Sequence, residues 1–353
     1  MQNEKCKVEI AKWKAGRKRR VFPFPKPQTG RPLRGLNAKH RTSNFQLQTK
    51  TSLLHARIAT PRPCDSHRAP FSVKKNAVRK PTPSHAPQPI GVFDSGIGGL
   101  TVVAALRKLL PAESIFYIGD TARVPYGGKS QATIERYSQE LSGLLLAERA
   151  KLIVVACNTA SALGVPRLRE TLRIPVTGVI EPGAQAAVKA TRTGKVGVIG
   201  TRATIASRAY ERAIEALDSE VRVFTEPCPL LVPLIEEGWL DDPVTDSIIA
   251  RYLEKLLRSG VDTLVLGCTH YPLLREAIQR HTGPDVTLVD SAQNTALAVQ
   301  KLLRQQKLAA PRASVGKLQV ALTDQSSAFL RVAEQALGLQ VGDTKLRAVQ
   351  HAA

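Results

Sequence analysis

Residues 90–99 have the sequence Ile-Gly-Val-Phe-Asp-Ser-Gly-Ile-Gly-Gly, in which a short apolar run leads directly into polar and glycine residues. The run Ile90–Phe93 predicts a buried strand, and Asp94–Gly99 predicts a tight loop. A helix is expected over Leu100–Leu110, because the next residue is a proline. Short apolar runs alternate with helical patterns from here onward, which indicates βαβ units with parallel sheets.

The same pattern restarts later in the chain and indicates an internal repeat. Val196–Ile199, with the sequence Val-Gly-Val-Ile, is similar to the first expected strand. The strand expected at 152–156 ends at Cys157, and the strand expected at 263–267 ends at Cys268. We therefore predict two similar α/β halves, each of which presents one cysteine at the C-terminal end of a strand.

Further elements are expected toward the C-terminus. Asp242 is suited to be the N-cap of a helix that has Pro243 at its first position and ends at Gly260. The runs Leu318–Leu322 and Phe329–Leu337 predict one more strand and helix, which would return to the first half.

The positive charge of the chain is concentrated at one end. The 353 residues include 51 Lys and Arg against 29 Asp and Glu, a formal net charge of +22. Residues 1–88 hold 21 of the basic residues and 3 of the acidic ones, so residues 89–353 have a net charge of only +4. A strongly basic chain ordinarily points to nucleic acid or an anionic surface. Here that argument applies only to the first quarter of the sequence.

Residues 1–88 are also rich in proline, and their apolar residues follow neither a helical nor a strand period. We therefore predict a disordered basic extension. Three interpretations of it stay open: an arm that contacts nucleic acid or an anionic surface, an organelle transit peptide, and a passive tail or incorrectly assigned start.

The five cysteines argue against a disulfide scaffold and a structural zinc site. Cys6, Cys64, Cys157, Cys228 and Cys268 form no Cys-x-x-Cys pair and no cysteine/histidine cluster of zinc type. We assign no chemical role to the first two and a structural role to Cys228. The sequence has no run of 18 apolar residues and no apolar core of a secretory signal. We expect a reducing, cytoplasmic compartment, no membrane contact and no metal.

Two thiols at equivalent strand ends predict proton-transfer chemistry. Ligands of open parallel sheets bind beyond the carboxyl ends of the strands, which is where Asp94, Cys157 and Cys268 all fall. If the halves pack face to face, one thiolate can remove a proton from a stereocentre while the opposite thiol supplies one to the other face. A single cysteine at a strand end is more often a packing residue, but two at equivalent positions favour a two-base racemase.

Each thiol needs neighbours that accept or relay its proton. Asp94 is the candidate at the first thiol, and His270 is the candidate at the second, with Glu236 or Glu237 to orient it. Polar residues that directly follow the cysteines are suited to holding a carboxylate: Asn158, Thr159 and Thr269.

The residues give no support for a bound cofactor. The glycine-rich loop Asp94–Gly99 fits neither the dinucleotide-binding pattern nor the Walker A pattern. A lysine beside a plausible pyridoxal-phosphate pocket is also missing. We therefore expect proton transfer without a cofactor.

Six motifs follow one another over roughly residues 89–337. They are Gly91-Val-Phe-Asp-Ser-Gly-Ile-Gly-Gly99, Pro125-Tyr-Gly-Gly128, Val155-Ala-Cys-Asn-Thr-Ala160, Gly178-Val-Ile-Glu-Pro182, Val232-Pro-Leu-Ile-Glu-Glu-Gly238 and Leu266-Gly-Cys-Thr-His-Tyr-Pro272. In sequence, order and spacing they resemble a known family, the cofactor-independent glutamate racemases within the aspartate/glutamate racemase superfamily.

The resemblance implies two pseudo-symmetric parallel-sheet α/β domains with the active site between them. The first domain would cover 89–182 and 291–337, the second 183–290, and a C-terminal tail 338–353. The basic extension is a departure, since the family core does not require it.

The resemblance also implies 1,1-proton transfer at the α-carbon of glutamate. Cys157 and Cys268 would be the acid/base thiols, with Asp94 assisting the first and His270 and Glu236 assisting the second. The substrate's amino and carboxylate groups would be held by Ser95, Pro125, Tyr126, Gly127, Asn158, Thr159 and Thr269.

The implied product, D-glutamate, would feed the synthesis of cell-wall peptidoglycan. We also expect a homodimer, although the resemblance does not fix the oligomeric state. Two alternatives stay open. One is a racemase of the same superfamily that acts on aspartate or a hydantoin. The other is a nucleic-acid-associated factor that acts through residues 1–88 and has a retired catalytic fold, although the presence of both thiols, Asp94 and His270 argues against retirement.

Overall fold

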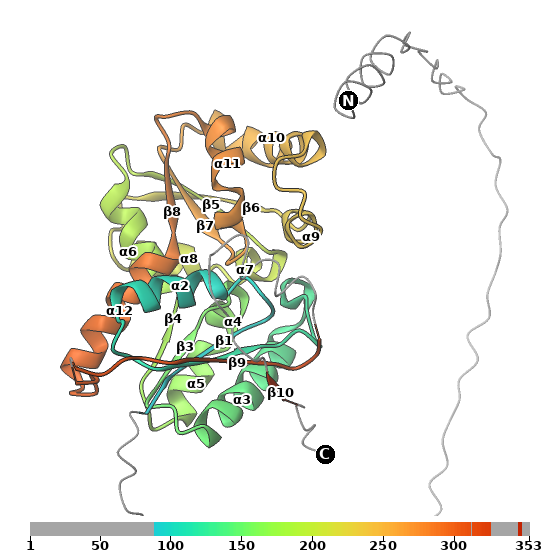
Figure 1. The fold of residues 1–353 in the computed structure, drawn as a ribbon. Coiled ribbons are helices and arrows are strands. Elements are labelled where there is room, and N and C mark those ends of the chain that lie inside the picture. The colour runs from blue at the N-terminus through green and yellow to red at the C-terminus, as the bar shows by residue number, and fades with distance from the viewer. Residues whose placement is uncertain (1–87, 312, 326–344, 348–353) are drawn as a thin grey trace, which may run out of the picture. The chain divides into compact units, whose positions relative to one another are not determined.

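The computed structural model describes residues 88–311, 313–325 and 345–347. These residues build two parallel β-sheets, which lie in separate lobes in Figure 1. The expected basic extension lies outside the described residues except for its last position, and the expected helix Phe329–Leu337 lies outside them entirely. The prediction of an α/β protein with two parallel sheets is confirmed.

Sheet A belongs to the first half of the repeat. Its strands are all parallel to their neighbours and stand in the order β10 (Lys345–Leu346), β9 (Leu318–Leu322), β2 (Ile115–Gly119), β1 (Ile90–Asp94), β3 (Leu152–Val155) and β4 (Val176–Gly178). The strand predicted at Leu318–Leu322 does return to the first half, where it pairs with β2. β1 runs one residue further than predicted because Asp94 pairs with Gly119. β10 comes from the stretch that was expected to be a tail.

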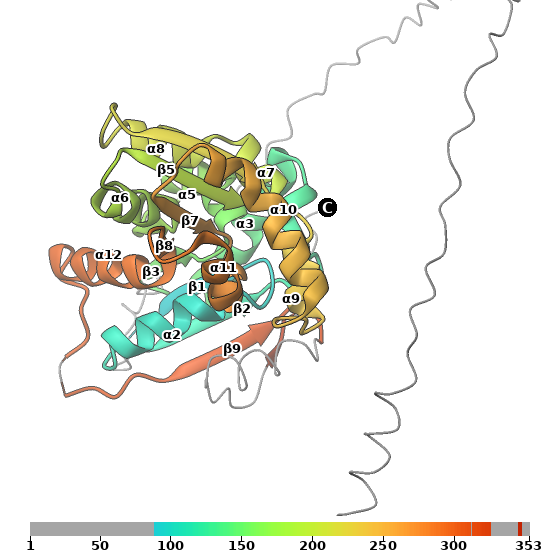
Figure 2. The same cartoon turned by 90° about the horizontal axis from the view of Figure 1, so that it is seen from above.

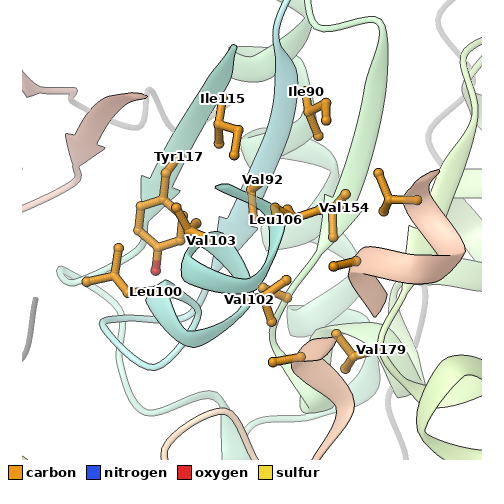
Figure 3. Close-up of a cluster of buried hydrophobic side chains, with 14 of the residues drawn as sticks. Ile90, Val92, Leu100, Val102, Val103, Leu106, Ile115, Tyr117, Val154 and Val179 are labelled. Carbon is orange, nitrogen blue, oxygen red and sulfur yellow. The ribbon is translucent and has the colours of Figure 1, made fainter. Parts of the chain in front are cut away.

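Alternate residues of the strands of sheet A face opposite layers, as the pleat of a strand requires. Ile90 and Val92 pack with α2 (Leu100–Leu109) and α12 (Ser291–Gln305) on one face, which Figure 3 shows in close-up. Phe93 faces the other way, toward the layer of α3 (Gln131–Ala147), α4 (Asn158–Leu163) and α5 (Val165–Thr171). Full burial of each such apolar side chain contributes about 1.5–3 kcal/mol.

Sheet B belongs to the second half. Its parallel strands stand in the order β6 (Arg222–Pro227), β5 (Lys195–Gly200), β7 (Thr263–Gly267) and β8 (Thr287–Asp290). One face is covered by α6 (Ile180–Ala190) and α8 (Ala209–Glu215), and the other by α9 (Leu231–Glu236), α10 (Pro243–Arg258) and α11 (Arg275–Thr282). The predicted limits of α10 are confirmed, since Asp242 accepts a hydrogen bond from the Val244 N–H and Gly260 adopts a left-handed φ of +72°.

The chain passes between the halves twice. It leaves sheet A through α6 and returns from sheet B through α12, and these two helices are in contact (Figure 2). The expected domain limits at 182/183 and 290/291 fall inside α6 and at the first residue of α12, and this division stays a prediction. No helix among the described residues is both long and apolar enough to cross a membrane.

Candidate active site

The loop after β1 is fixed by hydrogen bonds within the first half and approaches the second half closely. The Gly96 N–H donates to Asp94 Oδ2 at 3.0 Å, and the buried Tyr117 hydroxyl donates to the Gly96 carbonyl at 2.7 Å. A Cβ atom at Gly98 would lie only 2.4 Å from Thr269 Oγ1 and 2.6 Å from His270 Nδ1. The absence of a side chain at Gly98 therefore permits the contact between the two halves.

Cys157 lies at the end of β3 and directly before α4, and it is 5% exposed. Its thiol is within 3.5 Å of the Ser95 hydroxyl oxygen, to which it donates, and its sulfur accepts from the Ala160 N–H at 3.5 Å. Burial, together with the negative charge of Asp94, raises the pKa of Cys157 to about 12. The residue is therefore a protonated thiol at neutral pH.

Asp94 is fully buried, and its carboxylate connects the two halves. Thr269, from the second half, donates its hydroxyl to Asp94 Oδ1 at 3.4 Å. Burial raises the pKa of Asp94, and the charge of His270 and the hydrogen bonds to the carboxylate oppose that rise only in part. The sequence placed Asp94 beside Cys157, and the structure couples it to His270 as well.

Cys268 follows β7 as Cys157 follows β3, but its surroundings differ. Its sulfur lies 3.8 Å from His270 Nδ1, and His270 Nε2 lies 3.3 Å from Glu236 Oε1 at the end of α9. Burial alone would lower the pKa of His270, but the Cys268 sulfur and the Glu236 carboxylate outweigh it and raise that pKa to about 10. His270 is therefore an imidazolium at neutral pH.

Both thiols line one small cavity between the halves, which we call the two-thiol cavity. Its volume is about 30 Å³, and a single water needs roughly 10–15 Å³ of such space. Its lining consists of Ser95, Val124, Pro125, Tyr126, Gly127, Cys157, Asn158, Thr159, Thr201, Val232, Cys268, Thr269 and His270. Ten of the twelve residues predicted from the sequence are in this set. Asp94 and Glu236 lie behind it, in contact with Thr269 and His270 respectively.

Thr201 is a lining residue that the sequence analysis missed. It directly follows β5, as Ser95 directly follows β1. Its hydroxyl lies 2.9 Å from that of Thr159 and 2.9 Å from that of Thr204, so three hydroxyls join the halves. The internal repeat could have predicted this residue. Gly200 aligns with Asp94, so Thr201 aligns with the expected binding residue Ser95.

The segment Pro125–Gly127 closes another side of the cavity. The buried Tyr126 hydroxyl donates to Asp120, and the same carboxylate accepts from Arg123 Nε at 2.7 Å and from the Thr323 hydroxyl at 2.8 Å. A Cβ atom at Gly127 would lie 2.6 Å from Thr201 Cβ. The first half therefore holds this segment firmly against the second.

Cys228 lies outside the two-thiol cavity. It is fully buried after β6, and the three cysteines among the described residues are all free thiols. Cys6 and Cys64 lie outside the described residues.

Comparison with known proteins places this geometry in a family. The family model described as Asp/Glu/Hydantoin racemase matches residues 91–299, a range that contains the whole lining of the two-thiol cavity. This chain belongs to the Asp/Glu/Hydantoin racemase family. The resemblance drawn from the six motifs is thereby confirmed.

Glutamate racemases are among the similar members of this family. That of Geobacter metallireducens is 52% identical over 254 residues, which are 72% of this chain and 94% of that protein. The crystal structure of a glutamate racemase isoform from Bacillus anthracis is 41% identical with a TM-score of 0.71, over 76% of this chain and 99% of that one. The glutamate racemase of Francisella tularensis, solved in complex with D-glutamate, is 36% identical with a TM-score of 0.70, over 75% of this chain and 98% of that one.

Proposed function

We propose that this chain interconverts L- and D-glutamate by passing the α-proton between two thiols. The observation that carries the proposal is that Cys157 and Cys268, from equivalent positions of two sheets, line one small cavity. Glutamate is the substrate named for the similar racemases at 36–52% identity. The site therefore has one acid/base group for each face of the α-carbon.

The proton transfer needs one thiolate and one thiol at the start of each turnover. The thiolate removes the α-proton, the electron pair stays on the α-carbon and its carboxylate, and the opposite thiol then protonates the other face. The neighbours of the two thiols differ: burial beside Asp94 keeps Cys157 a thiol, while the His270 imidazolium lies 3.8 Å from the Cys268 sulfur. A neighbouring positive charge favours a thiolate.

Asp94, His270 and Glu236 assist the thiols. His270 lines the two-thiol cavity, whereas Asp94 and Glu236 lie behind its wall. Burial raises the pKa of Asp94 and so brings the carboxyl closer to the range in which it can accept and return a proton. The Glu236 carboxylate stabilises the positive charge of His270 at Nε2, while the Cys268 sulfur lies beside Nδ1 of the same ring. These are the roles expected from the sequence, with Asp94 at the first thiol and His270 together with Glu236 at the second.

The remaining lining residues hold the charged ends of the substrate. Amide and hydroxyl donors face the cavity from both halves, and a carboxylate accepts several such bonds. The binding residues are Ser95, Pro125, Tyr126, Gly127, Asn158, Thr159 and Thr269. Because the cavity is about 30 Å³, roughly the space of two waters, glutamate enters only when the halves separate and the bonds from Thr269 and Thr201 across them break.

Chiral analysis in deuterated water tests the function directly. L- and D-glutamate are incubated separately with the purified full chain and with Cys157→Ala and Cys268→Ala, without added cofactor. Racemisation with deuterium at the α-carbon, lost in either variant, is the expected result. Absence of turnover of both enantiomers would reject the proposal, and the same assay with aspartate and hydantoins would identify the alternative substrate.

The wider role that we infer is supply of D-glutamate for peptidoglycan by a homodimer in the cytoplasm. The resemblance to glutamate racemases supports this role, and a site that needs two free thiols favours a reducing compartment. Growth of a D-glutamate-requiring bacterium on expression of the chain tests the supply. Light scattering of the purified chain tests the dimer, with a monomer mass as the contrary result.

A further inference from the structure

The side-chain amide of Asn158 is an incompletely used donor in the wall of the two-thiol cavity. Asn158 is 2% exposed, and its Nδ2 atom has no hydrogen-bond partner among the described residues. A buried donor without an acceptor costs free energy. An unpaired amide that lines a ligand cavity is therefore suited to an acceptor that arrives with the ligand.

The other end of the same amide is occupied from the second half. The Tyr210 hydroxyl, on α8, donates to Asn158 Oδ1 at 2.7 Å. Tyr210 is 1% exposed and tightly seated: a Cβ atom at Gly183 would lie 3.1 Å from its hydroxyl oxygen, and one at Gly267 would lie 3.2 Å from its ring. Burial raises the pKa of Tyr210, so the hydroxyl keeps its proton at neutral pH.

This bond decides which atom of Asn158 faces the substrate. An amide has a carbonyl oxygen that only accepts and a nitrogen that only donates, while a carboxylate only accepts. A carbonyl oxygen turned toward the cavity would repel a carboxylate. The proton of Tyr210 binds the oxygen and so directs the nitrogen to the ligand.

We propose that Tyr210 is a positioning residue for substrate binding, which fixes the Asn158 amide so that Nδ2 donates to a carboxylate of the substrate. The proposal rests on the proposed racemisation of glutamate. Because Tyr210 and Asn158 belong to different halves, the donor is correctly set only while the halves are closed over the cavity.

The substitution Tyr210→Phe tests the proposal, with Tyr271→Phe as a matched control. Tyr271 is also fully buried, and its hydroxyl donates to the Cys228 carbonyl at 2.8 Å, away from the cavity. Each variant loses one hydroxyl and one buried hydrogen bond. We expect Tyr210→Phe to raise KM for both enantiomers about tenfold while kcat changes less than about threefold, since uniform binding is lost. Tyr271→Phe should leave KM unchanged.

A double-variant cycle separates positioning from general stability. Tyr210→Phe is combined with Asn158→Ala, which by itself should raise KM. If Tyr210 acts through Asn158, its substitution has no further effect on KM in the Asn158→Ala background. Equal effects in both backgrounds, or an unchanged KM in Tyr210→Phe alone, would overturn the proposal while leaving racemisation in place.

A measurement on the unsubstituted chain covers the case in which Tyr210→Phe does not fold. The side-chain amide resonances of Asn158 are identified in ¹⁵N spectra by their loss in Asn158→Ala. Addition of an equilibrium mixture of L- and D-glutamate should shift them if Nδ2 binds a carboxylate. Resonances that stay in place at saturating glutamate would reject the proposal, and failure of the unsubstituted chain to racemise glutamate would instead reject the proposed function.

Discussion

The two halves of the molecule present the same residue at the same place with opposite electrostatics. Cys157 and Cys268 both follow a central strand of a parallel sheet. The first has the Ser95 hydroxyl and the Asp94 carboxylate as neighbours, and the second has the His270 imidazolium. Gly200 takes the place of Asp94 in the repeat, so the second half has no carboxylate there.

The difference teaches that the repeat supplies the position of the thiols and the departures from it supply their chemistry. His270 occupies the position that Thr159 occupies in the first half. Burial next to a negative charge keeps Cys157 protonated, while the opposite thiol has a cation beside it. Two identical environments would place two thiols or two thiolates around the substrate, and neither pair can both take and give a proton.

The strongest test of the comparison removes one thiol at a time. Cys157→Ser and Cys268→Ser should each lower racemisation by about 10³-fold, since each deletes one acid/base group. Each variant should still exchange the α-proton of one enantiomer with deuterated solvent, and the enantiomer should differ between the two. Proton NMR of L- and D-glutamate followed separately measures this. Exchange of the same enantiomer by both variants would mean that the thiols do not face opposite sides of the α-carbon.

A second test forces the two halves apart at the glycine-rich loop. The substitution Gly98→Ala places a methyl group 2.4 Å from Thr269 Oγ1 and 2.6 Å from His270 Nδ1. We expect kcat/KM to fall about 10²-fold, because small displacements of groups around the reacting atoms have effects of that size. Gly96→Ala is the control, since its Cβ would meet only Val124 Cγ2 at 3.5 Å. Equal losses in both variants would show that the loop, and not its contact with the second half, is what matters.

The sequence predicts most of the fold and the thiols, for a physical reason. Strands and helices follow from local apolar periodicity, and the carboxyl ends of parallel strands collect functional groups. The repeat therefore located Cys157 and Cys268 without knowledge of the contacts between the halves. Contacts across the cavity depend on how the two sheets pack against each other, and the apolar periodicity of the sequence does not predict that packing.

Three residues illustrate this limit. The bond from Thr269 to Asp94 gives that carboxylate a role in both halves, although the sequence assigned it to one. Thr201 lines the cavity and Tyr210 bonds to Asn158, and neither stands next to a cysteine in the chain. β10 joins sheet A from a stretch without a strong strand pattern, because β9 offers it a free edge.

A third, smaller effect is expected from the carboxylate behind His270. Glu236→Gln removes the negative charge 3.3 Å from His270 Nε2, which should lower the pKa of His270 and reduce kcat about tenfold. Glu237→Gln changes the neighbouring residue in the same way and serves as the control. Histidine NMR and steady-state kinetics on both variants check the two effects. An unchanged titration of His270 in Glu236→Gln would mean that the Glu236 carboxylate does not raise the pKa of His270.

The smallest effect concerns stability and isolates the charge of His270. The pKa of this group in the folded chain is raised from its ordinary value of 6.5 to about 10. Its protonation therefore stabilises the folded state fully below about pH 6.5, and that contribution is lost as the pH rises toward 10. Urea unfolding of the natural chain and of His270→Gln at pH 6, 8 and 10 measures it, and the difference in unfolding free energy should shrink as the pH rises. A constant difference would mean that the pKa of His270 is the same in the folded and unfolded chain, so that the group is neutral at pH 8. The two thiols would then lack the opposite charges beside them, and their inequality would have to come from the bound substrate.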